Sequence, residues 1–179
     1  MHRDQLFAAL TKAIALLALP IAALRYRGHG RYVSAQWTLG LRFPAEDLRG
    51  LTPDAYRAFT SARAEALWRD GQLIGLTSGH RDAAVQHRMY LADQHSPGLP
   101  KVLPPDQSPH VRGYAMDVRP REGAQWLETH GWRYGLYRTY DNEWWHFEYH
   151  PGPPPPRLPH PVAIPGPFAA PGRPPTMWR

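Results

Sequence analysis

Two short stretches of this chain carry residue types that bind metals or move protons. The stretch NEWWHFEYH, residues 142–150, sets His146 among two acids and four aromatic residues, and SPHVRGYAMD, residues 108–117, contains His110 and Asp117. Two imidazoles and one carboxylate can hold zinc and leave a fourth position open. The spacing of His110 and Asp117 is weak evidence for a metal site by itself, because a single His or Asp usually only forms hydrogen bonds. The two stretches together indicate a candidate metal site.

The residues alone leave open which glutamate would act beside His146. Trp, Phe and Tyr favour a β-strand here, and side chains alternate between the two faces of a strand. On a regular strand Glu148 shares the face of His146, whereas Glu143 points the other way. Periodicity therefore favours Glu148, but a turn signal at 141–142 puts Glu143 at the start of the strand.

Length and composition predict one globular domain with tails, which we expect to be a monomer. The chain has 179 residues and a formal net charge of +6, so its surface favours polyanions such as nucleic acid, anionic lipid or an acidic wall polymer. It has 0 cysteines, which excludes disulfides, thiolate zinc sites and cysteine nucleophiles. A metal must therefore be held by His, Asp or Glu.

The N-terminal part is apolar. Residues 5–24 are long enough to cross a bilayer as a helix, although Lys12 and Pro20 interrupt the run and arginines flank both ends. We expect residues 1–32 to form a signal sequence or membrane anchor with a linker; a helix docked on the domain and a wrongly assigned start are the alternatives.

The middle of the chain, residues 33–150, is predicted to be the folded domain. Thr52 and Gly71 delimit a helix by their capping signals, and a second helix runs from Asp82 to about Gln94. A third helix is predicted over 122–131, with strands over 72–79, 113–118, 132–140 and 142–150 and a proline-rich loop over 95–109. The residues expected to face the core from the first two helices are Tyr56, Phe59, Ala66, Leu67, Val85, Met89 and Ala92.

The last part of the chain, residues 151–179, is proline-rich. It holds more than half of the 21 prolines, so we expect an extended or disordered tail.

Three motifs in order resemble those of the D-Ala-D-Ala metallopeptidases, a group that includes D,D-carboxypeptidases, D-Ala-D-Ala dipeptidases and, more distantly, lysostaphin-type and hedgehog-like domains. They are SGHR (78–81) with Gln86, SPHVRGYAMD (108–117) and NEWWHF (142–147). The resemblance covers about residues 37–150. It implies an α+β fold of the hedgehog-like metallopeptidase type, in which helices flank an antiparallel sheet that carries one zinc ion.

The resemblance also implies roles for residues at the matching positions. His110, Asp117 and His146 fall where the family binds zinc. Glu143 falls where it keeps the general base that activates water and returns the proton to the leaving amine. This role requires Glu143 to lie in the turn or at a bulge, outside the regular strand.

Further positions correspond to substrate contacts in the family. Arg81 matches the residue that stabilises the oxyanion or orients the substrate, and Gln86 and Ser108 match polar positions near the substrate's terminal carboxylate. Trp144 is a candidate for lining the cleft; it stands where carboxypeptidases commonly have proline, as His80 stands where the family usually has tyrosine.

The implied activity is hydrolysis of the D-Ala-D-Ala amide in a peptidoglycan stem peptide or in the free dipeptide, at the cell envelope. The EWWH form is that of the dipeptidases, whereas the short intervals between motifs are those of the carboxypeptidases, and we favour a carboxypeptidase. A dipeptidase, another peptidoglycan endopeptidase and a non-catalytic zinc-bearing wall-binding module are the alternatives. Only the net charge favours nucleic-acid binding, and we do not expect this function.

Overall fold

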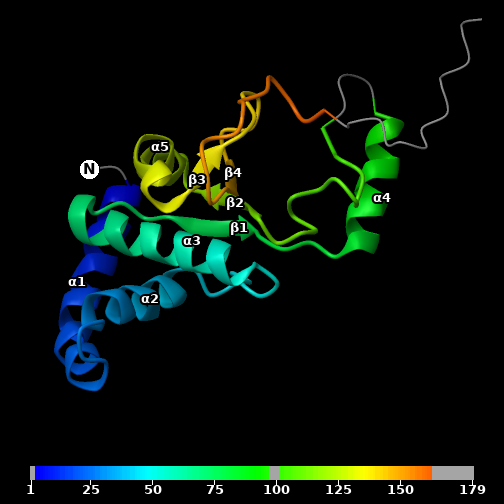
Figure 1. Ribbon diagram of the computed structural model, residues 1–179. Coiled ribbons are helices and arrows are strands. Elements are labelled where there is room, and N and C mark those ends of the chain that lie inside the picture. Colours follow the sequence, from blue (N-terminus) through cyan, green and yellow to red (C-terminus); the bar gives the residue numbers. More distant parts are fainter. Residues whose placement is uncertain (1–2, 97–100, 163–179) are drawn as a thin grey trace, which may run out of the picture.

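Four short strands form one antiparallel sheet in the computed structural model, which describes residues 3–96 and 101–162 (Figure 1). Their spatial order is β1 (Gly75–Ser78), β2 (Ala115–Arg119), β4 (His146–Tyr149) and β3 (Leu136–Arg138). The helices around the sheet are α1 (Arg3–Arg25), α2 (Gly30–Arg42), α3 (Pro53–Glu65), α4 (Ala83–Gln94) and α5 (Arg121–His130). The expected α+β class, an antiparallel sheet flanked by helices, is confirmed.

One face of the sheet is apolar and carries the main core. Met116 on β2 and Phe147 on β4 are neighbours across the two strands, and both are fully buried with Phe59 of α3. Because side chains alternate along a strand, Asp117 and His146 must then point to the opposite face. The core thus determines which face of the sheet is free for chemistry.

Helix α3 begins and ends as its capping residues predict. The Thr52 hydroxyl accepts a hydrogen bond from the Ala55 N–H at 3.3 Å, with Pro53 in the first turn. The helix continues as a π-helical turn over Ala66–Asp70, and Gly71 closes it with a left-handed φ of 62°. Of the residues expected to face the core, Phe59, Ala66 and Leu67 are buried, but Tyr56 is 40% exposed.

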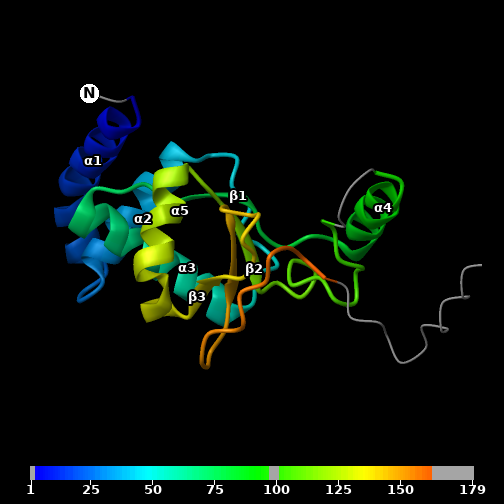
Figure 2. The same cartoon turned by 90° about the horizontal axis from the view of Figure 1, so that it is seen from above.

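Helix α4 has the predicted start, since the Asp82 carboxylate caps it, but its orientation differs from the prediction. Val85, Met89 and Ala92 were expected to face the core, and this is wrong because all three are exposed. In both views α4 lies on the far side of the sheet from α1 and α2 (Figure 2). The buried residue of this helix is the polar Gln86.

The second half of the domain has shorter strands than expected. The strand predicted over 132–140 is replaced at its start by a 3-10 helix, Gly131–Tyr134, and only Leu136–Arg138 form β3. Between them Gly135 adopts a φ of 71°, and a Cβ there would lie 2.6 Å from the His150 carbonyl oxygen. This tight turn ends the 3-10 helix and starts the strand.

Helix α1 packs along α2 through small side chains. Ala8 and Ala15 are buried in a second apolar cluster with Leu39 and Phe43 of the α2 region. α2 was not expected; it begins at Gly30, before the predicted domain boundary. By length and composition α1 could cross a membrane over 21 residues, a property that a signal sequence near an N-terminus shares.

The first part of the proline-rich tail follows the surface of the domain. Leu158 forms a parallel bridge with Tyr140. Its N–H donates to the Thr139 carbonyl oxygen at 2.9 Å, and its carbonyl oxygen accepts the Asp141 N–H at 2.8 Å. Arg157 adds an ion pair with Asp141 at 2.6 Å. The remainder of the predicted tail, 163–179, lies outside the described residues, as do 97–100 of the predicted loop.

A buried ion pair joins the N-terminal helices to the sheet. Arg63 of α3 donates to Glu46 at 2.7 Å and to Gln36 of α2 at 2.9 Å, and the other Glu46 oxygen accepts the Leu76 N–H of β1. The Arg63 and Glu46 side chains are only 3% and 4% exposed. Both charges are therefore satisfied within the protein.

We expect Glu46→Gln to lower the free energy of unfolding by about 3–5 kcal/mol, because it leaves the buried Arg63 charge without its partner. Urea unfolding followed by circular dichroism measures the loss. The matched control is Asp47→Asn, whose partner Arg49 is 91% exposed, and its unfolding midpoint should not change. Equal losses in both variants would contradict the assigned role of the buried pair.

Candidate metal centre

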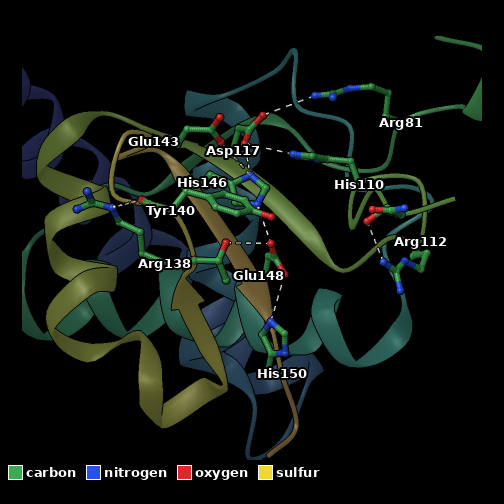
Figure 3. A network of polar contacts seen from close by, with 12 residues as sticks. Arg81, His110, Arg112, Asp117, Arg138, Tyr140, Glu143, His146, Glu148 and His150 are labelled. Atoms are coloured by element: carbon green, nitrogen blue, oxygen red, sulfur yellow. Dashed lines mark hydrogen bonds and ion pairs between the residues drawn. The ribbon is translucent and has the colours of Figure 1, made fainter. Parts of the chain in front are cut away.

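The register of β2 and β4 brings two of the expected metal ligands together. Asp117 and His146 are direct partners across the two antiparallel strands and share the face opposite the core. The Asp117 Oδ1 lies 3.0 Å from the His146 Nδ1. Figure 3 shows both side chains pointing toward one another above the sheet.

The third expected ligand, His110, comes from the loop before β2. Its carbonyl oxygen accepts the Gly113 N–H at 3.1 Å, and Gly113 has a φ of 74°. A Cβ at Gly113 would lie 2.3 Å from the Gly50 carbonyl oxygen, so this close approach requires glycine. The turn brings the His110 Nε2 to 3.3 Å from the Asp117 Oδ1.

These three side chains fit a zinc ion. Their ligand atoms all lie within 4.8 Å of one another. Zinc bonds nitrogen and oxygen at about 2.0–2.2 Å, so neighbouring ligand atoms of a tetrahedral site lie about 3.3–3.6 Å apart. The separation of 3.3 Å between Asp117 and His110 already has that spacing, and the 3.0 Å between Asp117 and His146 needs only a small expansion. His110, Asp117 and His146 therefore form a group that could bind a metal ion.

Hydrogen bonds behind the two imidazoles fix which nitrogen faces the site. The His110 Nδ1–H donates to the Gly79 carbonyl oxygen at 2.7 Å, which leaves Nε2 for the metal. The His146 Nε2 lies 3.1 Å from the Glu148 Oε1, which leaves Nδ1. Such contacts orient ligating histidines and raise their basicity.

Glu148 belongs to this network, although the motif resemblance does not include it. It is buried, and the Thr139 hydroxyl donates to it at 2.9 Å while the His150 Nε2 lies 3.2 Å from its other oxygen. Strand periodicity did indicate Glu148 as the acid on the face of His146. Its position behind the imidazole suits orientation of the ligand, not attack on a substrate.

The ionic contacts of the group shift the pKa values of its members. Burial by itself raises the pKa of the Asp117 carboxyl, but hydrogen bonds from His110 and His146 outweigh it and hold that pKa below its usual range. Burial likewise opposes the charged form of His146, but Asp117 and Glu148 raise the pKa of its imidazole to about 9. A metal that binds at Nδ1 would displace this proton.

Glu143 lies near Asp117, on the side of His146 that carries Nδ1, as Figure 3 shows. It precedes β4 in a turn that the His146 N–H closes onto the Glu143 carbonyl oxygen at 3.2 Å, so it lies outside the regular strand. Its Oε2 is 3.9 Å from the His146 Nδ1. Burial raises the pKa of its carboxyl, and the Asp117 charge adds to this although His146 opposes it.

Arg81 is held at the edge of the same site by neighbouring polar groups. Its guanidinium donates to the Gln86 Oε1 at 2.8 Å and the Ser78 hydroxyl at 3.2 Å, and it lies 3.7 Å from the Asp117 Oδ2. The Gln86 side-chain N–H donates in turn to the Leu103 carbonyl oxygen at 2.7 Å. Arg81 therefore has a fixed position beside the expected ligands.

A cavity of about 230 Å³, the metal-site cavity, opens beside the three expected metal ligands. It is lined by the expected residues Arg81, Gln86, Ser108, His110, Asp117, Glu143 and His146. Tyr140, Trp145 and Pro161 also line it, and the Tyr140 ring packs on His146 with centroids 5.2 Å apart. None of these three was expected from the sequence.

Trp144 does not line this cavity. It packs against the main core, and the Arg121 guanidinium lies 5.6 Å from its ring. The turn before β4 sends the two neighbouring tryptophans in different directions, with their rings perpendicular. The cavity is instead bordered by Trp145.

No family model matches this chain, and no curated protein matches it. Among solved structures it is similar to a zinc complex of a variant of VanY, a vancomycin-resistance D,D-pentapeptidase from a VanB-type cassette, with 20% identity over 58% of this chain and 76% of that one and a TM-score of 0.49. The LD-carboxypeptidase LdcB shares 26% identity over 56% and 65% of the two chains, with a TM-score of 0.46. The L,D-carboxypeptidase DacB from Streptococcus pneumonia shares 25% identity over 57% and 67%, with a TM-score of 0.45.

We expect Glu148→Gln to weaken zinc binding by about 10–100-fold, because the amide orients the His146 ring less firmly and lowers its basicity. Competition with a coloured chelator measures the dissociation constant. The control is His150→Gln, which removes only a partially exposed contact on the far oxygen and should change zinc affinity by far less. If zinc affinity is equal in wild type and Glu148→Gln, Glu148 does not support the ligand.

Proposed function

We propose that this protein is a zinc-dependent D,D-carboxypeptidase that removes the terminal D-alanine from peptidoglycan stem peptides. The observation that carries the proposal is the convergence of a His-Asp-His group with a separate half-buried carboxylate, Glu143, on its open side. A structural metal site has no use for this additional acid. A hydrolase needs a group that accepts the proton of the attacking water.

A zinc ion held by His110, Asp117 and His146 would supply Lewis acidity, which polarises the amide carbonyl and makes water a better nucleophile near neutral pH. Glu143 accepts the proton of that water as its oxygen bonds to the carbonyl carbon. The same carboxyl then gives the proton to the nitrogen of the leaving D-alanine as the C–N bond breaks. The raised pKa of Glu143 suits both transfers.

Arg81 supplies a fixed positive charge at the rim of the cavity. Its contacts with Gln86 and Ser78 hold the guanidinium in place before a substrate binds, so little side-chain freedom is lost on binding. The charge can pair with the oxyanion that develops on the carbonyl or with the terminal carboxylate of the stem peptide. Gln86 and Ser108 lie along the same wall.

The proposed place of action is the cell envelope, where peptidoglycan lies. Helix α1 supports this, because it is apolar enough to act as a signal or a membrane attachment.

Glu143→Gln should keep zinc and lose turnover by about 10²–10⁴-fold, because an amide cannot accept the proton. Zinc content is measured by atomic emission, and turnover by release of D-alanine from a pentapeptide stem. The control Glu122→Gln removes an exposed acid outside the metal-site cavity and should leave turnover unchanged.

The same variant separates an enzyme from a wall-binding module. A module that only binds peptidoglycan would sediment with sacculi equally in wild type and Glu143→Gln and would release no product in either. That result would contradict the proposed catalysis.

Substrate choice is tested with three substrates of the wild-type enzyme: a pentapeptide stem, a tetrapeptide stem and free D-Ala-D-Ala, each with and without chelator. We expect D-alanine from the pentapeptide only, and none after zinc removal, with products identified by mass spectrometry. Cleavage of the free dipeptide alone would indicate a dipeptidase, and trimming of the tetrapeptide an L,D-specificity; either would contradict the proposed D,D-carboxypeptidase.

A further inference from the structure

A second cavity, of about 350 Å³, lies between the start of α1 and the edge of the sheet. Its walls include Gln5 and Ala8 of α1, Arg42 and Phe43 at the end of α2, and Arg119 at the end of β2. It shares no lining residue with the metal-site cavity. The proposed peptidase chemistry gives this cavity no role.

Two guanidinium groups in this cavity stack on one aromatic ring. The Arg42 and Arg119 Cζ atoms lie 5.0 and 5.2 Å from the centroid of Phe43, and Arg42 also lies 4.6 Å from the centroid of Phe7. Stacking orients the planar groups but does not neutralise them. The cavity therefore holds two positive charges against the apolar ring of Phe43.

Neither charge is balanced by an acid within the described part of the chain. No ion pair within 4.0 Å joins Arg42 or Arg119 to a carboxylate there, although Glu122 also lines the cavity. The Arg42 Nε is buried and has no hydrogen-bond partner among the residues that the structure describes. A buried donor without a partner is costly unless a ligand or water satisfies it.

The exposed face of α1 begins next to this cavity. Its buried side carries Ala8 and Ala15, whereas large aliphatic side chains cover the opposite side. These are Leu6, Leu10, Leu17, Ile21 and Leu24, each at least 53% exposed. At helical spacing they form one apolar stripe. Because α2 packs on the buried side of α1, this stripe faces away from the protein and is available to lipid.

We propose that Arg42 and Arg119 bind a phosphate-bearing anion in this cavity, and that a phospholipid headgroup supplies it at the membrane surface. Guanidinium groups bind phosphate oxygens through paired N–H donors, and an anion here would satisfy the Arg42 Nε and both charges. The cavity and the start of the stripe lie at the same end of α1, so a headgroup bound in the cavity brings Leu6 and Leu10 to the membrane surface. The apolar stripe of α1 then lies in the bilayer interface, as amphipathic membrane-bound helices do.

The test compares the full chain with Arg42→Gln/Arg119→Gln and with Arg49→Gln/Arg57→Gln, a control that removes the same charge from exposed ion pairs. Flotation measures binding to phosphatidylcholine vesicles with and without phosphatidylglycerol. We expect wild type and control to bind phosphatidylglycerol vesicles at least about tenfold more tightly than the cavity variant, while binding to pure phosphatidylcholine stays equal in all three.

A second arm uses inorganic phosphate and follows the thermal unfolding midpoint. If phosphate stabilises the wild type but not the cavity variant, and phosphatidylglycerol gives no preference, the anion site stands and its source is a soluble phosphate. If neither probe distinguishes the cavity variant from the wild type, or if both double variants lose binding equally, the site is overturned.

Zinc content and the unfolding midpoint verify that each variant is folded. Should the double variant fail to fold, Arg119→Gln replaces it, because that side chain is exposed and contributes only stacking. It should lose at least about fivefold in binding to phosphatidylglycerol vesicles. Wild-type binding in this single variant would equally overturn the proposal.

Discussion

The site depends on one constraint, the pairing of Asp117 with His146 across β2 and β4. Antiparallel partners on one face have their side chains about 5 Å apart, which is close enough for both to reach one ion. Shifting the register by one residue would turn His146 into the core and Phe147 toward the ligands. The burial of Met116 and Phe147 on the other face prevents that shift. Ordinary hydrophobic packing therefore specifies the positions of the charged residues on the other face.

Much of this arrangement follows from local sequence signals. Thr52 and Asp82 cap the helices that they were expected to start, and Gly71 ends the first of them, because capping depends on a few adjacent residues. The motifs also named the three side chains that converge on one point. The turn at 141–142 explains why Glu143 escapes the alternation of a regular strand.

Other features depend on contacts between distant parts of the chain, and the sequence alone did not predict them. The buried face of α4 was predicted wrongly because that helix borders the metal-site cavity instead of the core. Its apolar residues therefore do not pack against the core. Trp145 rather than Trp144 lines the cavity because the turn before β4, not strand periodicity, sets their directions. The role of Glu148 required the position of the imidazole, and α2 had no strong capping signal.

The proline-rich segment has a consequence for how the cavity beside the metal-binding side chains can vary. Its backbone pairs beside Tyr140, and Pro161 reaches the rim of the cavity. One wall of the site thus comes from a chain segment that contributes no strand to the sheet and no residue to the metal group. Changes there would reshape the space offered to a ligand while leaving the main core and the metal-binding side chains untouched. Ligand selectivity and metal binding can therefore diverge separately in this architecture, with residues 151–162 as the variable part.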